Sequence, residues 1–166
     1  MKYDNLYLYS DGGCNLTLSK SVGAYAYIIA HDDDDKEADQ IKLYEDSKMI
    51  LDTTNNKMEL LGAIEGFKRL EREKVEFGKL YVRSDSMYLI KGVTRWIEIW
   101  KQNNWKTKSG GDVKNQDYWL KLDYYKTKYN PIFEWVKGHE TTKLNIECDA
   151  MCSKLIKEGM EQIKKE

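Results

Sequence analysis

The chain contains few of the residues that interrupt regular structure or cross-link it. Among 166 residues there is one proline, Pro131, and there are three cysteines, Cys14, Cys148 and Cys152. An odd number of cysteines without a Cys-x-x-Cys pair argues against a disulfide framework or a zinc finger and indicates reduced thiols. No apolar run approaches the roughly 18 residues of a membrane span, and the N-terminal residues include no apolar secretory segment. We therefore expect a cytoplasmic protein that makes no contact with a membrane.

The length and composition of the chain limit the classes of protein to which it can belong. Hydrophobic residues make up 41% of the chain and charged residues 33%, which is typical of a folded globular protein and not of a disordered tail. A chain of this length can bury a substantial core, and no repeat or low-complexity linker divides it. We expect residues 1–166 to form a single domain that acts as a monomer.

Charge is distributed unevenly along the sequence, although the net charge is only −1. Residues 91–128 contain nine Lys or Arg and four acids, a balance of +5, together with several aromatic residues. Residues 31–52 contain nine acids and three Lys, a balance of −6. The four adjacent acids Asp32–Asp35 fit a solvated loop better than a metal site. A basic segment that carries aromatic residues is what a polyanion-binding surface requires.

The stretch Thr53–Leu60 joins a run of small polar residues to a helical pattern. Leu60 and the apolar residues after it recur at helical spacing, which predicts a helix from about Asn56 to Glu73. Glu59 lies three residues after Asn56, so one interpretation is a capping box with Asn56 as the N-cap. The other interpretation is that Glu59 projects into a polar site beside the two amides of Asn55 and Asn56. The stretch alone leaves both open.

The remaining pattern predicts an alternation of strands and helices. Strands are expected at about residues 6–9, 22–30, 41–51, 79–83 and 132–136. Helical segments are expected at about residues 56–73, 88–100, 115–128 and 148–163, with Asn115 as a possible N-cap. Three strands that precede the first helix, followed by alternating elements, indicate a mixed sheet with helices on its faces.

Four carboxylates stand at junctions of these elements. Asp11 and Asp85 each follow Ser at the end of an apolar strand, while Glu59 and Asp149 fall early in helices. Asp has a low strand propensity, and the glycines after Asp11 leave the backbone open to close approach. An ordinary Asp-Gly hairpin turn is the alternative for Asp11.

Together with several local motifs, these carboxylates closely resemble the type 1 ribonuclease H family over almost the whole chain. The matching pieces, in order, are Ser10–Cys14, Thr53–Leu60, Ser84–Ser86, the segment Trp96–Thr107, Val113–Asn115, Trp135–His139 and Cys148–Asp149. The resemblance implies an α/β, ribonuclease H-like fold with a five-stranded mixed sheet, in which three antiparallel strands precede two parallel ones, flanked by helices.

The resemblance also implies a metal-dependent endonuclease that hydrolyses the RNA strand of RNA/DNA hybrids and leaves 5′-phosphate and 3′-hydroxyl ends. Its catalytic residues would be Asp11, Glu59, Asp85 and Asp149, with His139 on a loop. Four converging carboxylates repel one another unless a cation neutralises them. Hard oxygen ligands suit two Mg2+ ions, with Mn2+ as a substitute, and the carboxylates would be the metal ligands.

Positions that match the family's substrate contacts fall into three groups. The RNA strand would be contacted by Cys14, Asn55 and Asn56, since 2′-hydroxyl groups distinguish RNA from DNA. The DNA strand and its phosphates would be contacted by Thr54, Ser86, Tyr88, Trp96 and Asn115. A basic protrusion would carry Lys101, Lys106, Lys108 and Lys114.

Some positions depart from the family pattern. The loop of residues 15–22 lacks the usual Gly/Pro-rich form, so its RNA-contacting residue is undefined, and Met87 stands where Gln is frequent. Two alternatives are a DNA nuclease or strand transferase on a related fold, and a hybrid-binding protein without activity. The amides of Asn55 and Asn56 and the basic segment favour a hybrid substrate over DNA. The complete set of carboxylates argues against lost activity.

Overall fold

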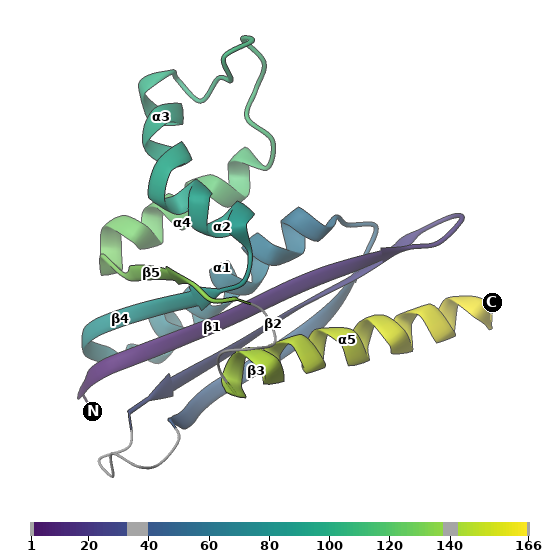
Figure 1. Ribbon diagram of the computed structural model, residues 1–166, viewed down its shortest axis with the longest axis horizontal. Coiled ribbons are helices and arrows are strands. Elements are labelled where there is room, and N and C mark those ends of the chain that lie inside the picture. Colours follow the sequence, from purple (N-terminus) through teal and green to yellow (C-terminus); the bar gives the residue numbers. More distant parts are fainter. Residues whose placement is uncertain (1, 33–39, 138–142, 166) are drawn as a thin grey trace.

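The computed structural model describes residues 2–32, 40–137 and 143–165. Five strands form one mixed sheet in the order β3-β2-β1-β4-β5 (Figure 1). The strands are β1 (Lys2–Leu16), β2 (Ser21–His31), β3 (Ile41–Leu51), β4 (Glu76–Ser84) and β5 (Ile132–Trp135). β1, β2 and β3 pair antiparallel, whereas β4 is parallel to β1 and β5 is parallel to β4. The predicted architecture of three antiparallel and two parallel strands is confirmed.

Helices cover both faces of this sheet (Figure 1). α1 (Asn55–Glu73) and α4 (Gln116–Tyr129) pack on one face, where Phe67 and Trp119 are fully buried. α5 (Lys143–Lys164) packs on the other face, where Cys148 and Cys152 join a second buried cluster. A strand between two covered faces has no solvated side, which explains why β2 is an almost continuous run of buried Val, Ala, Tyr and Ile.

The segment between β4 and α4 rises away from the sheet (Figure 1). It begins with α2 (Met87–Lys91), continues through a π-helical turn (Gly92–Trp96) into α3 (Ile97–Gln102), and returns by a loop to α4. Three tryptophans of this segment pack together and against Trp119 of α4: Trp100 lies 5.4 Å from Trp119 and 6.0 Å from Trp105 between ring centroids, and Trp96 lies 5.9 Å from Trp100. Among the residues described, no helix is long and apolar enough to cross a membrane.

Candidate active site

Asp11 and Asp85 are brought together by the parallel pairing of β1 and β4. The pairing ends at Tyr9 and Arg83, so Asp11 lies just past it on β1, and Asp85 is the first residue after β4. The prediction that Asp11 follows a strand was wrong, because β1 continues to Leu16 against β2 and pairs Asp11 with Ala26. Asp11 therefore has a fixed strand backbone instead of a hairpin turn.

Glu59 reaches the same point because the start of α1 lies against β1 with no side chains between them. A Cβ at Gly12 would stand 2.2 Å from the carbonyl carbon of Met58, and one at Gly62 would stand 2.8 Å from the Asp11 carbonyl oxygen. Both distances are shorter than real Cβ contacts. The glycine after Asp11 thus admits the α1 backbone and places Glu59 beside Asp11.

The N-cap of α1 is Thr54, and the capping-box interpretation of Asn56 was wrong. Thr54 has an extended backbone, and its hydroxyl accepts from the Lys57 N–H at 3.1 Å. Asn56 already lies inside the first turn, so the helix entry does not need the Glu59 carboxylate. Glu59 points instead into the site, where its Oε2 is buried with no hydrogen-bond partner in the described part of the chain.

Three carboxylates form a compact cluster. Oxygen atoms of Asp11, Glu59 and Asp85 all lie within 4.8 Å of one another. Asp149, in the second turn of α5, is outside this compact group, but its side chain is half-buried and lies close enough to Asp11 to raise the pKa of that carboxyl. The structure therefore brings together all four carboxylates that the sequence singled out, three of them closely.

Burial governs the protonation of this cluster. Burial, together with repulsion from Asp11, Asp85 and Asp149, raises the pKa of Glu59 to about 9. The pKa of Asp11 is also raised, first by burial and then by Asp85, although the Gly12 N–H opposes the change. Hard oxygen donors, mutual repulsion and an unsatisfied buried oxygen on Glu59 fit a divalent cation such as Mg2+.

Two supporting residues had no predicted role. The Trp135 indole N–H donates to the Asp85 carbonyl at 3.0 Å. Ser21 holds the turn before α1 through two hydrogen bonds: its hydroxyl donates to the Thr53 carbonyl at 2.7 Å and accepts from the Thr53 N–H at 2.8 Å. Trp135 stands within a matching motif, so the sequence marked its position but not its partner. Ser21 carried no sequence signal.

The amides proposed to contact RNA lie on the rim of the site. Asn55 and Asn56 are exposed in the first turn of α1. Cys14 is half-buried, and its thiol donates to the Thr53 carbonyl at 3.5 Å, which connects the β1–β2 hairpin to the turn before the helix. The predicted RNA-contacting residues therefore form one connected group next to the carboxylates.

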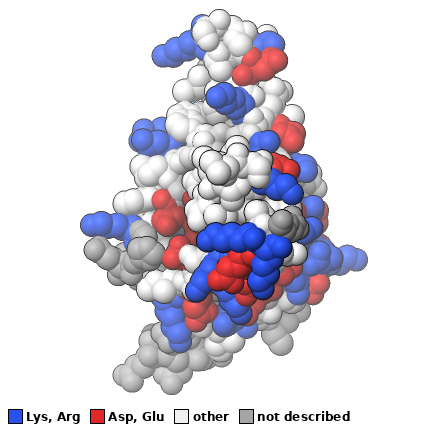
Figure 2. All heavy atoms as spheres, turned by 90° about the vertical axis from the view of Figure 1, so that its right-hand side faces the viewer, with Lys and Arg blue, Asp and Glu red and all other residues white. Residues whose placement is uncertain are grey.

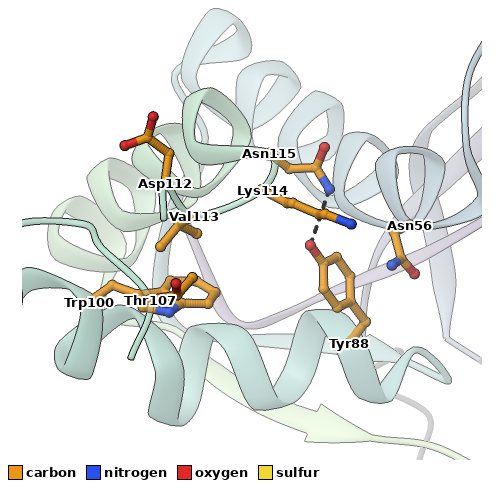
Figure 3. A pocket seen from close by; sticks show the side chains of 8 residues that line it. All are labelled: Asn56, Tyr88, Trp100, Thr107, Asp112, Val113, Lys114 and Asn115. Atoms are coloured by element: carbon orange, nitrogen blue, oxygen red, sulfur yellow. Dashed lines mark hydrogen bonds between the residues drawn. The ribbon is translucent and has the colours of Figure 1, made fainter. Parts of the chain in front are cut away.

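A cavity of about 320 Å³ opens between α1 and the segment that precedes α4 (Figure 3). Within it Asn115 Nδ2 donates to the Tyr88 hydroxyl at 3.1 Å. Asn115 is the N-cap residue of α4, as predicted, but it has a left-handed backbone (φ 59°) and its side chain makes no capping hydrogen bond. The cavity is lined by Asn56, Tyr88, Trp100, Thr107, Asp112, Val113, Lys114 and Asn115.

The other residues predicted for the DNA strand lie outside this lining. Thr54 is exposed and caps α1. Ser86 is buried, caps α2 and accepts from the Leu89 N–H at 3.1 Å. Trp96 is half-buried, with its ring 5.8 Å from that of Tyr88 between centroids. The structure thus places Tyr88 and Asn115 in one cavity, with Trp96 packed against Tyr88 and Ser86 at the start of the helix that carries Tyr88. Thr54 is not among these residues.

The positive charge of the predicted basic protrusion is partly neutralised by nearby acids of the protrusion and of α4. Lys101 forms an ion pair with Asp123 at 2.8 Å, and Lys106 pairs with Asp112. Lys108 is exposed, and Lys114 lines the cavity next to Asn115 (Figure 3). His139 lies outside the described residues.

A five-stranded mixed sheet covered by helices, with a carboxylate cluster where β4 ends, defines a ribonuclease H-like protein. The model of the family described as RNase H matches residues 4–157. A ribonuclease H of Francisella philomiragia is 36% identical over 157 residues, which cover 95% of this chain and 94% of that protein. The chain therefore belongs to the RNase H family.

Solved structures agree in fold. LC9-RNase H1, described as a type 1 RNase H with the type 2 active-site motif, superposes with a TM-score of 0.77 at 23% identity, covering 92% of this chain and 72% of that one. LC11-RNase H1, solved in complex with an RNA/DNA hybrid, gives a TM-score of 0.61 at 21% identity, covering 93% and 99%.

Proposed function

We propose that this chain is an endonuclease that hydrolyses the RNA strand of RNA/DNA hybrids and leaves 5′-phosphate and 3′-hydroxyl ends. The observation that carries the proposal is the cluster of Asp11, Glu59 and Asp85, whose carboxylate oxygens lie within 4.8 Å of one another beside two exposed amides. Residues 1–166 would act as one catalytic domain and as a monomer. The relative LC11-RNase H1, which was solved with a hybrid, supports the substrate class.

Divalent cations would be held by the carboxylates of Asp11, Glu59, Asp85 and Asp149. The proposal includes two Mg2+ ions, which Mn2+ could replace, because the donors are hard oxygens only. Bound ions of this kind lower the pKa of water and stabilise charge on phosphate oxygens. Without cations, the raised pKa of Glu59 shows how strongly this environment opposes several negative charges.

Recognition of RNA would depend on the first turn of α1. The amides of Asn55 and Asn56 can each donate to and accept from a ribose 2′-hydroxyl, as can the backbone near Cys14. Thr54 fixes the helix entry and Ser21 fixes the preceding turn, so the amides have a defined position relative to Asp11. His139 is proposed to assist proton transfer during the reaction or departure of the product.

Binding of the DNA strand would involve the cavity of Figure 3. Asn115 and Tyr88 present hydrogen-bonding groups there, and Lys114 adds a positive charge. Thr54, Ser86 and Trp96 are proposed to complete this contact. The lysines of the protrusion would contact phosphates further along the duplex, and the ion pairs of Lys101 and Lys106 limit their effect.

The test compares matched RNA/DNA, DNA/DNA and RNA/RNA duplexes, each labelled on either strand, with Mg2+ or with a chelator. We expect cleavage of the RNA strand of the hybrid alone, lost with the chelator and in Asp11→Asn. Equal cutting of the DNA duplex would overturn the substrate class, and full activity of Asp11→Asn would overturn the site. Mapping of the product ends checks the 5′-phosphate and the 3′-hydroxyl.

A further inference from the structure

The pairing of β1 with β4 ends at Tyr9 and Arg83, just before the carboxylates. Asp11 lies two residues past Tyr9, and Asp85 lies two residues past Arg83. Past this pair, within the part of the chain that the structure describes, β1 continues against β2 alone. The separation of Asp11 from Asp85 therefore depends on how firmly this last pair holds the two strands together.

The side chains of this last pair also bond to each other. Arg83 Nη1 donates to the Tyr9 hydroxyl at 2.9 Å, and Arg83 Nε donates to Glu134 Oε1 at 2.9 Å. Glu134 is the residue of β5 that pairs with Arg83, so the three side chains form one row across β1, β4 and β5. A guanidinium group suits the middle of such a row because its donors form a rigid, planar fork. The row connects three strands at the point where the β1–β4 pairing ends.

Aromatic rings surround the guanidinium group of Arg83. Its Cζ lies 4.7 Å from the centroid of the Tyr7 ring and 5.8 Å from those of Tyr9 and Tyr81. The Arg83 side chain is only 23% exposed. In Figure 2, by contrast, Lys and Arg lie beside Asp and Glu on the outer surface, where ion pairs contribute little to stability. The shielded position of Arg83 strengthens its hydrogen bonds and holds the guanidinium group in place.

Tyr9 connects this row to α5 as well. The Tyr9 side chain is 1% exposed, and its hydroxyl donates to Gln40 Oε1 at 2.7 Å while it accepts from Arg83. The Cys148 thiol of α5 donates to the Tyr9 carbonyl at 3.6 Å, and Asp149 is the next residue of that helix. Tyr9 thus joins β1, β4 and α5, the elements that carry or directly precede three of the four carboxylates.

We propose that Tyr9 and Arg83 are positioning residues for Asp11 and Asp85. The bond between the two side chains fixes the separation of the strands where their pairing ends, and this separation sets the affinity of the carboxylates for divalent cations. This role rests on the proposed function, in which the carboxylates are metal ligands. Tyr9 and Arg83 act through the backbone that leads to each carboxylate. A displaced carboxylate weakens metal binding because the coordination geometry is strict, above all for Mg2+.

The first test measures metal binding without substrate, from the electron paramagnetic resonance signal of free Mn2+. Tyr9→Phe removes the hydroxyl and keeps the buried ring. Tyr7→Phe is the matched control, because the Tyr7 hydroxyl lies on the same strand and the same face but donates to Asp32 Oδ2 at 3.1 Å. We expect Tyr9→Phe to weaken Mn2+ binding about three- to tenfold, less than the roughly 10- to 100-fold typical of groups that bond a metal ligand directly. Tyr7→Phe should bind Mn2+ as the wild-type chain does, and equal affinities of the two variants would overturn the proposal.

A second test shows whether the effect passes through Arg83. Tyr9→Phe also removes the bond to Gln40, so the change is repeated in a chain that carries Arg83→Met and already lacks the guanidinium group. We expect Tyr9→Phe to weaken Mn2+ binding in the wild-type background and to have no further effect in the Arg83→Met background. Additive losses would contradict the proposal.

Cleavage assays give a third readout. The kcat of Tyr9→Phe should fall about three- to tenfold at limiting Mg2+ and recover at saturating Mg2+, with an unaltered KM for the hybrid. A loss that saturating Mg2+ does not restore would contradict a role in metal affinity. If the wild-type chain binds no Mn2+ or cleaves no hybrid, the proposed function fails and this role fails with it. If the wild-type chain does both and Tyr9→Phe is unaltered, only the positioning role fails.

Discussion

The indole N–H of Trp135 donates to the backbone carbonyl of Asp85 at 3.0 Å, across the adjacent ends of β5 and β4. The last ladder bond between these strands joins the Val136 N–H to the Ser84 carbonyl at 2.9 Å. The Trp135 side chain therefore extends the hydrogen bonding of the sheet by one residue, to the residue that carries a carboxylate of the cluster. We infer that Trp135 is a positioning residue for Asp85.

Trp135→Phe removes this N–H and keeps an aromatic ring. We expect a loss of activity on the order of tenfold, as is typical when the support of a metal ligand is removed, with a higher Mg2+ requirement and an unchanged KM for the hybrid. A Mg2+ titration of cleavage at saturating hybrid measures this. Trp135 is 48% exposed, so thermal unfolding should shift little. An unaltered Mg2+ requirement would show that the bond does not position Asp85.

Asp11→Asn should stabilise the metal-free protein while it abolishes activity. The change removes one charge from a buried cluster in which Asp11 is repelled by Asp85 and Asp149. Since one pKa unit corresponds to about 1.4 kcal/mol, we expect the free energy of unfolding near pH 8 to rise by on the order of 2 kcal/mol. Urea denaturation in chelator measures the difference. A less stable variant would show that the repulsion is already relieved in the metal-free state.

The stability of the metal-free protein should fall as pH rises. The pKa of Glu59 is about 9 in the folded chain, against an ordinary value of 4.5. Between these values the folded state binds more protons than the unfolded state, so the free energy of unfolding decreases with pH. The stability that the protonated Glu59 side chain contributes is complete below about pH 4.5 and is lost as pH rises through about 9. Urea denaturation in chelator at several pH values measures the free energy of unfolding as a function of pH. This free energy should fall less steeply with pH for Glu59→Gln than for the wild-type chain, and equal pH dependence of the two would refute the prediction.

Gly12→Ala should disturb both stability and the site. The added methyl group would meet the Met58 carbonyl carbon at 2.2 Å, so the start of α1 must move away from β1 and take Glu59 with it. We expect destabilisation of about 1–3 kcal/mol and a large loss of activity. Gly111→Ala is the control, because its nearest neighbour would be Thr107 Oγ1 at 3.7 Å. If both variants resemble the wild-type chain, the close packing of α1 on β1 is not required.

Much of the fold was predictable because the apolar spacing and the family motifs indicated the same order of strands and helices. The order of strands and helices followed from apolar spacing, and the family motifs supplied the pairing of the sheet. The glycines after Asp11 correctly predicted a close backbone approach, although the approaching group, the start of α1, belongs to a distant segment. Local sequence could not show that β1 extends past Asp11, since this depends on pairing with β2.

The site was predictable in its residue types but less so in its supports. Asp11, Glu59 and Asp85 lie together as expected, and Asn115 is the N-cap residue of α4, yet the capping role predicted for Asn56 was wrong. Ser, Thr, Asp and Asn all favour N-caps, so the sequence did not distinguish Asn56 from Thr54, two residues earlier. Bonds such as that from Trp135 to Asp85 join residues 50 positions apart, and no local pattern encodes them.

The most direct test of the central claim replaces one non-bridging oxygen of the scissile phosphate by sulfur. If cations held by Asp11, Glu59 and Asp85 contact this phosphate, sulfur should slow cleavage strongly with Mg2+, which prefers oxygen, and much less with Mn2+. The measurement is the single-turnover rate of a hybrid with one cleavage site, for each sulfur diastereomer and each metal. We predict that at least one diastereomer is rescued by Mn2+ in the wild-type chain. Equal slowing with both metals for both diastereomers would contradict a contact between the carboxylate-bound cations and the reacting phosphate.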